Sequence, residues 1–139
     1  MTVSSTAIAR SIPSARARTR LLTVGAAALA TTAIWTLAVQ VFGVQLLVHF
    51  GGGTAQTVGV AYVLMASLSA ALVGWALLAA LERRNVHAIV LWTRVAVGVL
   101  VVSLALPLSA GTTTATRAVL VTMHVVAAAV IIWGMRRGA

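Results

Sequence analysis

The chain contains no cysteine and no lysine, and Glu82 is its only acidic residue. Without cysteine, disulfides, iron–sulfur clusters and thiolate metal sites are excluded. With one carboxylate there is no acidic pair for general acid–base catalysis and no Ser/His/Asp arrangement. The glycines at 51–53 are not followed by the lysine that a phosphate-cradling loop requires. We therefore expect a protein that is not an enzyme and that holds no metal or cofactor.

Apolar residues make up 61% of the 139 residues and charged residues only 8%. Soluble domains have an apolar share of roughly 45–50%, so the composition indicates that lipid is the main solvent of this chain. The net charge of +9 comes from arginines at the ends of apolar runs rather than from a basic patch interleaved with aromatics. We therefore expect the lipid bilayer as a partner and no nucleic acid.

Four apolar runs, separated by arginines or by small polar links, predict the architecture. The first run has about thirty residues and would span about 45 Å as a helix, against a hydrocarbon core of roughly 30 Å. We expect this helix to end near Gly43 and the following "VQLLVHF" to lie along the far interface. The expected segments are a disordered basic tail (1–20) and a transmembrane domain (21–137) with spans at about 21–43, 57–81, 89–108 and 114–135. The predicted fold class is an all-α membrane protein, a four-transmembrane-helix bundle built from two antiparallel hairpins.

A secretory signal is the competing interpretation of the N-terminal region. The small-residue pattern Ala28-Leu29-Ala30 resembles a cleavage site, and basic residues precede the apolar run. The apolar core of such signals has 7–15 residues, whereas this run continues well past the candidate cut. A membrane span is therefore the favoured interpretation.

Orientation follows from the arginines, because cytoplasmic loops are enriched in basic residues. Arg117 alone lies toward one side, and Arg94 falls just inside the third span, close to the other. The remaining arginines all lie on that other side: Arg10, Arg16, Arg18, Arg20, Arg83, Arg84, Arg136 and Arg137. We therefore expect a multi-pass protein of the cytoplasmic membrane with both termini in the cytoplasm. Trp92 falls near the predicted inner boundary, where tryptophan is typical as an interfacial anchor.

Small and polar residues recur at helical spacing within the first two spans, where they would hold the helices together. In lipid, association depends on close packing of small residues and on interhelical hydrogen bonds. The two faces consist of Ala66, Ala70 and Gly74 in the second span and Thr32, Thr36 and Gln40 in the first. We expect these faces to pack on each other; the alternative is that the polar face lines a path for something that passes or binds.

His124 lies in the middle of the fourth span, seven residues after Arg117. The two residues share a helix face about 10 Å apart along the axis, which places Arg117 near the headgroups. One interpretation is that His124 bonds to a serine, threonine or carbonyl of a neighbouring helix. The other is that His124 accepts a proton or binds a ligand, since ionisable residues are costly at that depth in the membrane and mark functional sites. A proton relay needs at least a second proton-carrying group, and no Asp or Glu lies within a span.

Three functions remain open at this stage. We expect a non-enzymatic accessory or interaction subunit, with another membrane protein or a second copy as partner. The alternative is a small transporter or permeation element that uses His124 and the polar face of the first span. A haem or redox protein is the third, with His49 and His124 as the only pair that could supply two axial ligands.

Short motifs appear in a fixed order along the chain: "LERR" after the second span, "LWT" and "SLALPLS" at the ends of the third, then "GTTTAT" and "MHVVAAAVII". Over roughly residues 20–135 this order resembles a family of small four-helix integral membrane proteins of actinobacteria, classed as a domain of unknown function. Met123-His124 is the most distinctive part of the resemblance, and Arg94 departs from it. The resemblance implies a fold and a lineage, with no established activity, substrate or cofactor.

Overall fold

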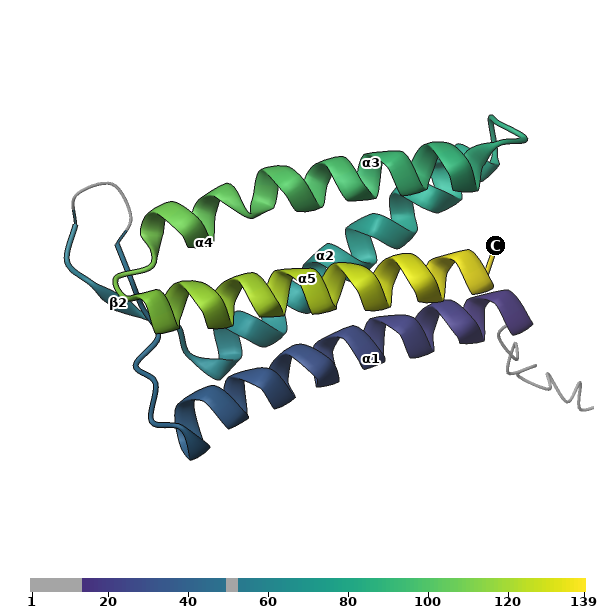
Figure 1. The fold of residues 1–139 in the computed structure, drawn as a ribbon. Helices are drawn as coiled ribbons and strands as arrows, with labels where there is room; N and C mark the ends of the chain where they lie inside the picture. Colours follow the sequence, from purple (N-terminus) through teal and green to yellow (C-terminus); the bar gives the residue numbers. More distant parts are fainter. Residues whose placement is uncertain (1–13, 50–52) are drawn as a thin grey trace, which may run out of the picture.

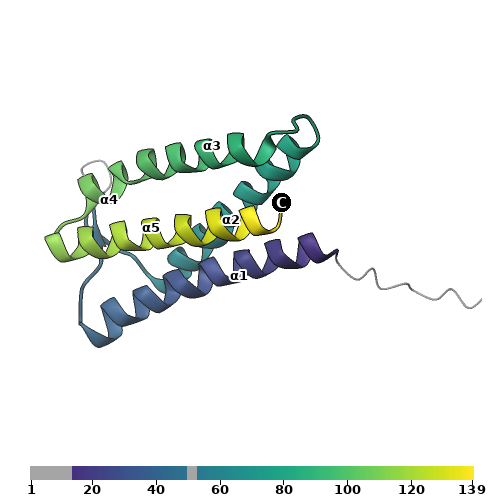
Figure 2. The same cartoon turned by 45° about the vertical axis from the view of Figure 1, so that its right-hand side comes forward.

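Four long helices lie side by side and run in alternating directions in the computed structural model, which describes residues 14–49 and 53–139 (Figure 1). α5 lies between α1 and α3, and it stays between them when the molecule is turned (Figure 2). The elements are α1 (Ala15–Thr36), the π-helical turn η1 (Leu37–Val41), β1 (Leu47–Val48), β2 (Gln56–Thr57), α2 (Val60–Glu82), α3 (Ala88–Ser103), α4 (Ala105–Ala110) and α5 (Thr114–Arg137).

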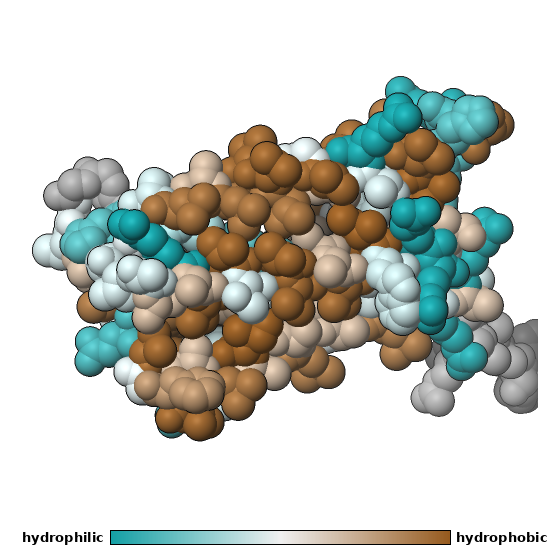
Figure 3. Space-filling model, viewed as in Figure 1, coloured by the Kyte–Doolittle hydropathy of each residue, from teal (hydrophilic) through white to brown (hydrophobic). Residues whose placement is uncertain are grey.

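Each of the four helices is long and apolar enough to cross a bilayer, with mean hydropathies of 1.7 to 2.3 over the most apolar stretch. The four-helix membrane fold predicted from the sequence is therefore confirmed. On the face shown in Figure 3, apolar residues cover most of the middle of the molecule, and hydrophilic residues collect toward its two ends. This distribution suits a chain surrounded by lipid at mid-height and by water at both ends.

The start of the first helix differs from the expectation. α1 already begins at Ala15, so the predicted disordered tail over residues 1–20 is wrong for residues 15–20, and residues 1–13 lie outside the described part. Ser14 is the N-cap, and its hydroxyl accepts a hydrogen bond from the Ala17 N–H at 3.3 Å. Serine is a strong N-cap, and alanine and arginine favour helix. These local preferences start the helix before the apolar run does.

The first helix ends at Val41, close to Gly43, where the sequence predicted the end of the span. The helix closes through η1, where the Phe42 N–H donates to the Leu37 carbonyl at 3.0 Å. Gly43 then adopts a φ of +65°, a left-handed conformation that glycine adopts without steric cost. The chain turns out of the helix here.

The segment after Gly43, as far as His49, folds over the end of the bundle where α1 ends and α5 begins. β1 pairs with β2 in an antiparallel hairpin, and Val48 also bridges to Gly111. Leu46 and Val48 are buried at 1% and 4% exposure, because alternate residues of an extended segment point the same way. The His49 N–H donates to the Ala110 carbonyl at 2.9 Å. This cap ties the first hairpin to the second.

The third span is interrupted close to the end that lies beside the β1–β2 hairpin. α3 ends at Ser103 and α4 continues to Ala110, two residues beyond the predicted end at Leu108. Pro107 has no N–H to donate to the Ser103 carbonyl four residues earlier, which explains why the helix is divided at this point. Pro107 itself is buried against the bundle.

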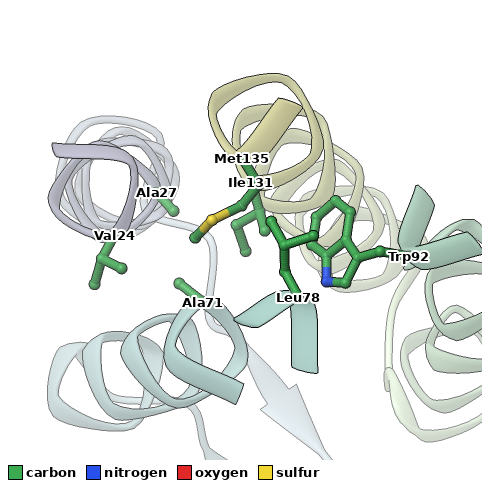
Figure 4. Packing of buried hydrophobic residues seen from close by; sticks show 7 residues of the cluster. All are labelled: Val24, Ala27, Ala71, Leu78, Trp92, Ile131 and Met135. Carbon is green, nitrogen blue, oxygen red and sulfur yellow. The ribbon is translucent and has the colours of Figure 1, made fainter. Parts of the chain in front are cut away.

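Two buried clusters hold the bundle together, one toward each end. One lies beneath the β1–β2 cap and contains Leu46, Val48, Val58, Val63, Ala110, Leu120 and Met123. The other joins α1, α2, α3 and α5 and contains Val24, Ala27, Ala71, Leu78, Trp92, Ile131 and Met135 (Figure 4).

Trp92 belongs to the core and is not an interfacial anchor, so that expectation is wrong. Its side chain is only 1% exposed and reaches from α3 toward Leu78 and Ile131 (Figure 4). Its indole N–H donates to the Gly74 carbonyl of α2 at 2.8 Å. A buried tryptophan is stable when its one donor is paired in this way.

Candidate functional site

The only acidic residue forms a structural clamp at the end of the bundle where α1 begins and α5 ends. The Arg20 side chain is 8% exposed, and its guanidinium lies 2.5 Å from the Glu82 carboxylate. Its Nε also donates to the Gly138 carbonyl at 3.2 Å. Three chain segments that are distant in sequence are joined here. The ion pair and the bond to Gly138 account for the burial of the Arg20 side chain.

The polar link between α1 and α2 is formed by residues that the sequence analysis did not select. The Thr31 and Ser67 hydroxyls lie 2.7 Å apart, and both are buried. Thr32 instead donates to the Ala28 carbonyl of its own helix at 2.7 Å. Successive helical residues differ by about 100° around the axis, so the neighbour of an inward residue lies off the interface.

The predicted polar face of the first span is wrong as a lining for the bundle interior. Thr36 is exposed and donates to the Thr32 carbonyl at 2.9 Å, four residues back. Gln40 is also exposed. Threonine hydroxyls commonly bond to their own helix in this way. Thr36 and Gln40 therefore lie on the outside of the bundle, and Thr32 is half-buried.

The small residues of α2 also have a different place from the one expected. Ala66 and Ala70 are exposed, so their predicted packing against α1 is wrong; Ala71 is fully buried instead. Gly74 does pack, but toward α3 and α5: an added Cβ would lie 3.6 Å from Trp92 and 3.8 Å from Ile131. This face of α2 borders a hollow.

The main hollow lies between α2, α3 and α5 and has a volume of about 330 Å³. It forms because α3 and α4 are attached mainly at their two ends, through Trp92 near one end and through Pro107 and Ala110 near the other. Between these contacts, small residues on α2 and α5 leave space. The small lining residues on these two helices are Ala70, Gly74, Ala127 and Ala128.

His124 lies at the junction of two hollows. It lines the main one and also a smaller one, of about 140 Å³, which Thr31 and Ser67 border. Its Nδ1 lies 2.8 Å from the Leu120 carbonyl of its own helix. The predicted hydrogen bond from His124 to a neighbouring helix is therefore wrong, because a carbonyl within its own helix satisfies this nitrogen.

Arg117 stabilises the link between α4 and α5. Its Nε donates to the Gly111 carbonyl at 2.9 Å. A Cβ at Gly111 would lie 2.6 Å from the Arg117 Cγ and 2.9 Å from the Pro107 carbonyl oxygen, so glycine is needed for this close approach. Arg117 is exposed and lies almost two turns away from His124, so the two do not form one site.

The two histidines considered as haem ligands are not brought together. His49 belongs to the cap beside Ala110, whereas His124 lies about 12 Å along α5 from Thr116. Thr116 itself marks the level of the cap, because its hydroxyl donates to the Gln45 carbonyl at 3.1 Å. Within residues 14–49 and 53–139, no group of three or more His, Cys, Asp or Glu residues could hold a metal ion.

Comparison with known proteins is consistent with this picture. A family described as "Family of unknown function (DUF6069)" matches residues 11–139, which is almost the entire sequence. No curated protein and no solved structure gives a significant match.

Proposed function

The chain belongs to the DUF6069 family of unknown function, and from its structure we propose that it is a non-enzymatic accessory subunit of the cytoplasmic membrane. In this role it engages a second membrane protein through the outer face of α3 and α4. The bundle of α1, α2 and α5 is the support that holds this face in the bilayer. The alanine-rich, lysine-free sequence supports an actinobacterial source.

The single observation that carries the proposal is how little of the third span is buried. Only 6% of its most apolar stretch is buried, against 22–33% in the other three spans. In lipid, helices gain little from apolar contact alone and depend on close packing with a neighbour. A helix that packs so little within its own chain has its surface free for a partner.

The charge distribution supports an orientation with both termini in the cytoplasm. Arginines gather where α1 begins and where α2 and α5 end, and Arg117 lies at the opposite end. The Arg137 guanidinium also lies 3.6 Å from the ring centroid of Trp133, a pairing suited to the headgroup region. By the basic-residue rule, the arginine-rich end faces the cytoplasm.

Neither alternative function gains support from the geometry. The permeation alternative needs a polar face directed inward, but Thr36 and Gln40 are exposed. The haem alternative needs two imidazoles at one level, but His49 lies in the cap and His124 lies about 12 Å further along α5. The accessory role is left with the strongest support.

Photocrosslinking from single positions tests the proposal. Benzoylphenylalanine replaces Val97 or Val101 on α3; both are exposed, and neither lines the main hollow. The matched control replaces Leu29 on α1, which is 73% exposed. We expect one discrete protein adduct from both α3 positions in native membranes and none from position 29. The same adduct from all three positions, or none from α3, would contradict the proposal.

A further inference from the structure

Two side chains that line the main hollow, His124 and Ser103, have hydrogen-bond acceptors that remain free. A carbonyl can only accept, so His124 Nδ1 must be the donor to Leu120 and carry the ring proton. In the neutral imidazole, Nε2 on the opposite side of the ring then has a free lone pair. The Ser103 hydroxyl donates to the Leu100 carbonyl at 2.8 Å, which leaves its oxygen lone pairs free.

The residues that line the hollow have no free side-chain hydrogen-bond donor. The remaining side-chain N–H on its wall belongs to Trp92, and it is already donated to the Gly74 carbonyl. All lining residues belong to the described part of the chain, and none of them is Asp, Glu, Lys or Arg. An ionised headgroup would be desolvated here without a counter-charge, at a high free-energy cost. The chemistry of the wall therefore favours a neutral ligand that donates a hydrogen bond.

The size and position of the hollow suit a ligand that arrives from the membrane. A volume of about 330 Å³ is within the range of small-molecule pockets, about 300–1,000 Å³. Val73 and Val99 line the hollow and are exposed on the apolar flank of the molecule, so the hollow opens toward lipid. His124 is about 12 Å from the level of Thr116, which places the acceptor near the middle of the bilayer.

We propose that this hollow binds a neutral, lipid-soluble molecule whose head is a hydroxyl group, of the long-chain alcohol class. The hydroxyl donates to His124 Nε2, and the apolar body lies along the small residues Ala70, Gly74 and Ala128. The proposed partner docks on the outer face of α3, whereas this site lies on the inner face. The inference therefore does not depend on the accessory role.

A matched pair of photoreactive probes tests the hydroxyl requirement. The full-length chain is placed in nanodiscs of zwitterionic phospholipid and irradiated with hexadecanol that carries a mid-chain diazirine, or with the methyl ether of the same probe. We expect saturable labelling of α3 and α5 peptides by the alcohol and about five- to tenfold weaker labelling by the ether, since one hydrogen bond is lost. Equal labelling by the two probes would overturn the proposal.

Variants locate the site on the same readout. Ala128→Leu fills the hollow and should abolish the labelling, whereas Ala129→Leu, at the exposed neighbouring position, should leave it unchanged. His124→Leu keeps most of the volume but removes the acceptor, so labelling by the alcohol should fall to the level of the ether. Labelling that resists both Ala128→Leu and His124→Leu would overturn the proposal. The comparison of the two probes uses the unsubstituted chain, so it tests the proposal even if a variant fails to fold.

The two experiments distinguish failure of the proposed ligand site from failure of the accessory role. A chain that takes up the alcohol probe but gives no protein adduct from Val97 retains the ligand site and loses the docking role. The converse result retains the docking role and removes the ligand site.

Discussion

The contact between α1 and α5 at Gly134 gives the sharpest test of the packing. An added Cβ at Gly134 would lie 2.5 Å from Thr23 Cγ2 and 2.8 Å from Thr23 Cβ, and it would also meet Thr23 Oγ1. Thr23 is buried, and its hydroxyl donates to the Thr19 carbonyl at 2.9 Å. Because a Cβ is fixed to its backbone, the two helices must separate to admit Gly134→Ala.

The expected free-energy change is the balance of two effects. Overpacking of a tight interface typically costs about 1–3 kcal/mol, while replacement of a helical glycine by alanine returns up to about 1 kcal/mol. We therefore expect Gly134→Ala to destabilise the fold by about 1–2 kcal/mol. Gly98→Ala is the matched control on α3, where an added Cβ has no atom within 4 Å, so only the gain of up to about 1 kcal/mol applies.

Reversible unfolding in mixed detergent micelles, followed by far-ultraviolet circular dichroism, measures this difference. Thr23→Ala removes the Oγ1 and Cγ2 contacts and leaves only the Cβ contact at 2.8 Å, so the double variant should recover part of the loss. A Gly134→Ala protein at least as stable as Gly98→Ala would refute the close approach of α1 and α5.

Two further predictions use the same unfolding assay, with Ser69→Ala at an exposed position of α2 as a control expected to change stability by less than about 0.5 kcal/mol. Glu82→Gln should cost about 2 kcal/mol, because the buried Arg20 loses its counter-charge; the figure is below the 3–5 kcal/mol of fully buried pairs since the Glu82 side chain is 30% exposed. Ser67→Ala should cost about 1 kcal/mol through the lost hydrogen bond to Thr31, and a value equal to that of the control would show that this pair does not join the helices.

The number of spans could be predicted from the sequence, because arginines and small polar links must interrupt apolar runs wherever the chain leaves the bilayer. The rotation of each helix about its own axis could not be predicted from the sequence. In lipid the outward face is as apolar as the inward one, so hydropathy does not mark the packed side. Thr31 and Ala71 form the interfaces, whereas the sequence analysis selected the neighbouring Thr32 and Ala70.

The cap was missed for a different reason. Leu46 and Val48 alternate with residues that point outward, a pattern typical of strands, and Gly43 precedes them. This short alternating pattern was missed because it directly follows a long apolar run. Sequence reasoning did identify His124 as the residue of interest, but its hydrogen bond within α5 and the hollow beside it depend on how three helices meet.

The central claim is that the chain crosses the bilayer four times with its arginine-rich end in the cytoplasm, and cysteine accessibility tests it most directly. The chain has no cysteine of its own, so Asn85→Cys and Ser109→Cys each introduce a single thiol at an exposed position. A membrane-impermeant maleimide should label the thiol at position 109 in intact cells and the thiol at position 85 only after permeabilisation. The reverse pattern, or labelling of both in intact cells, would contradict the account.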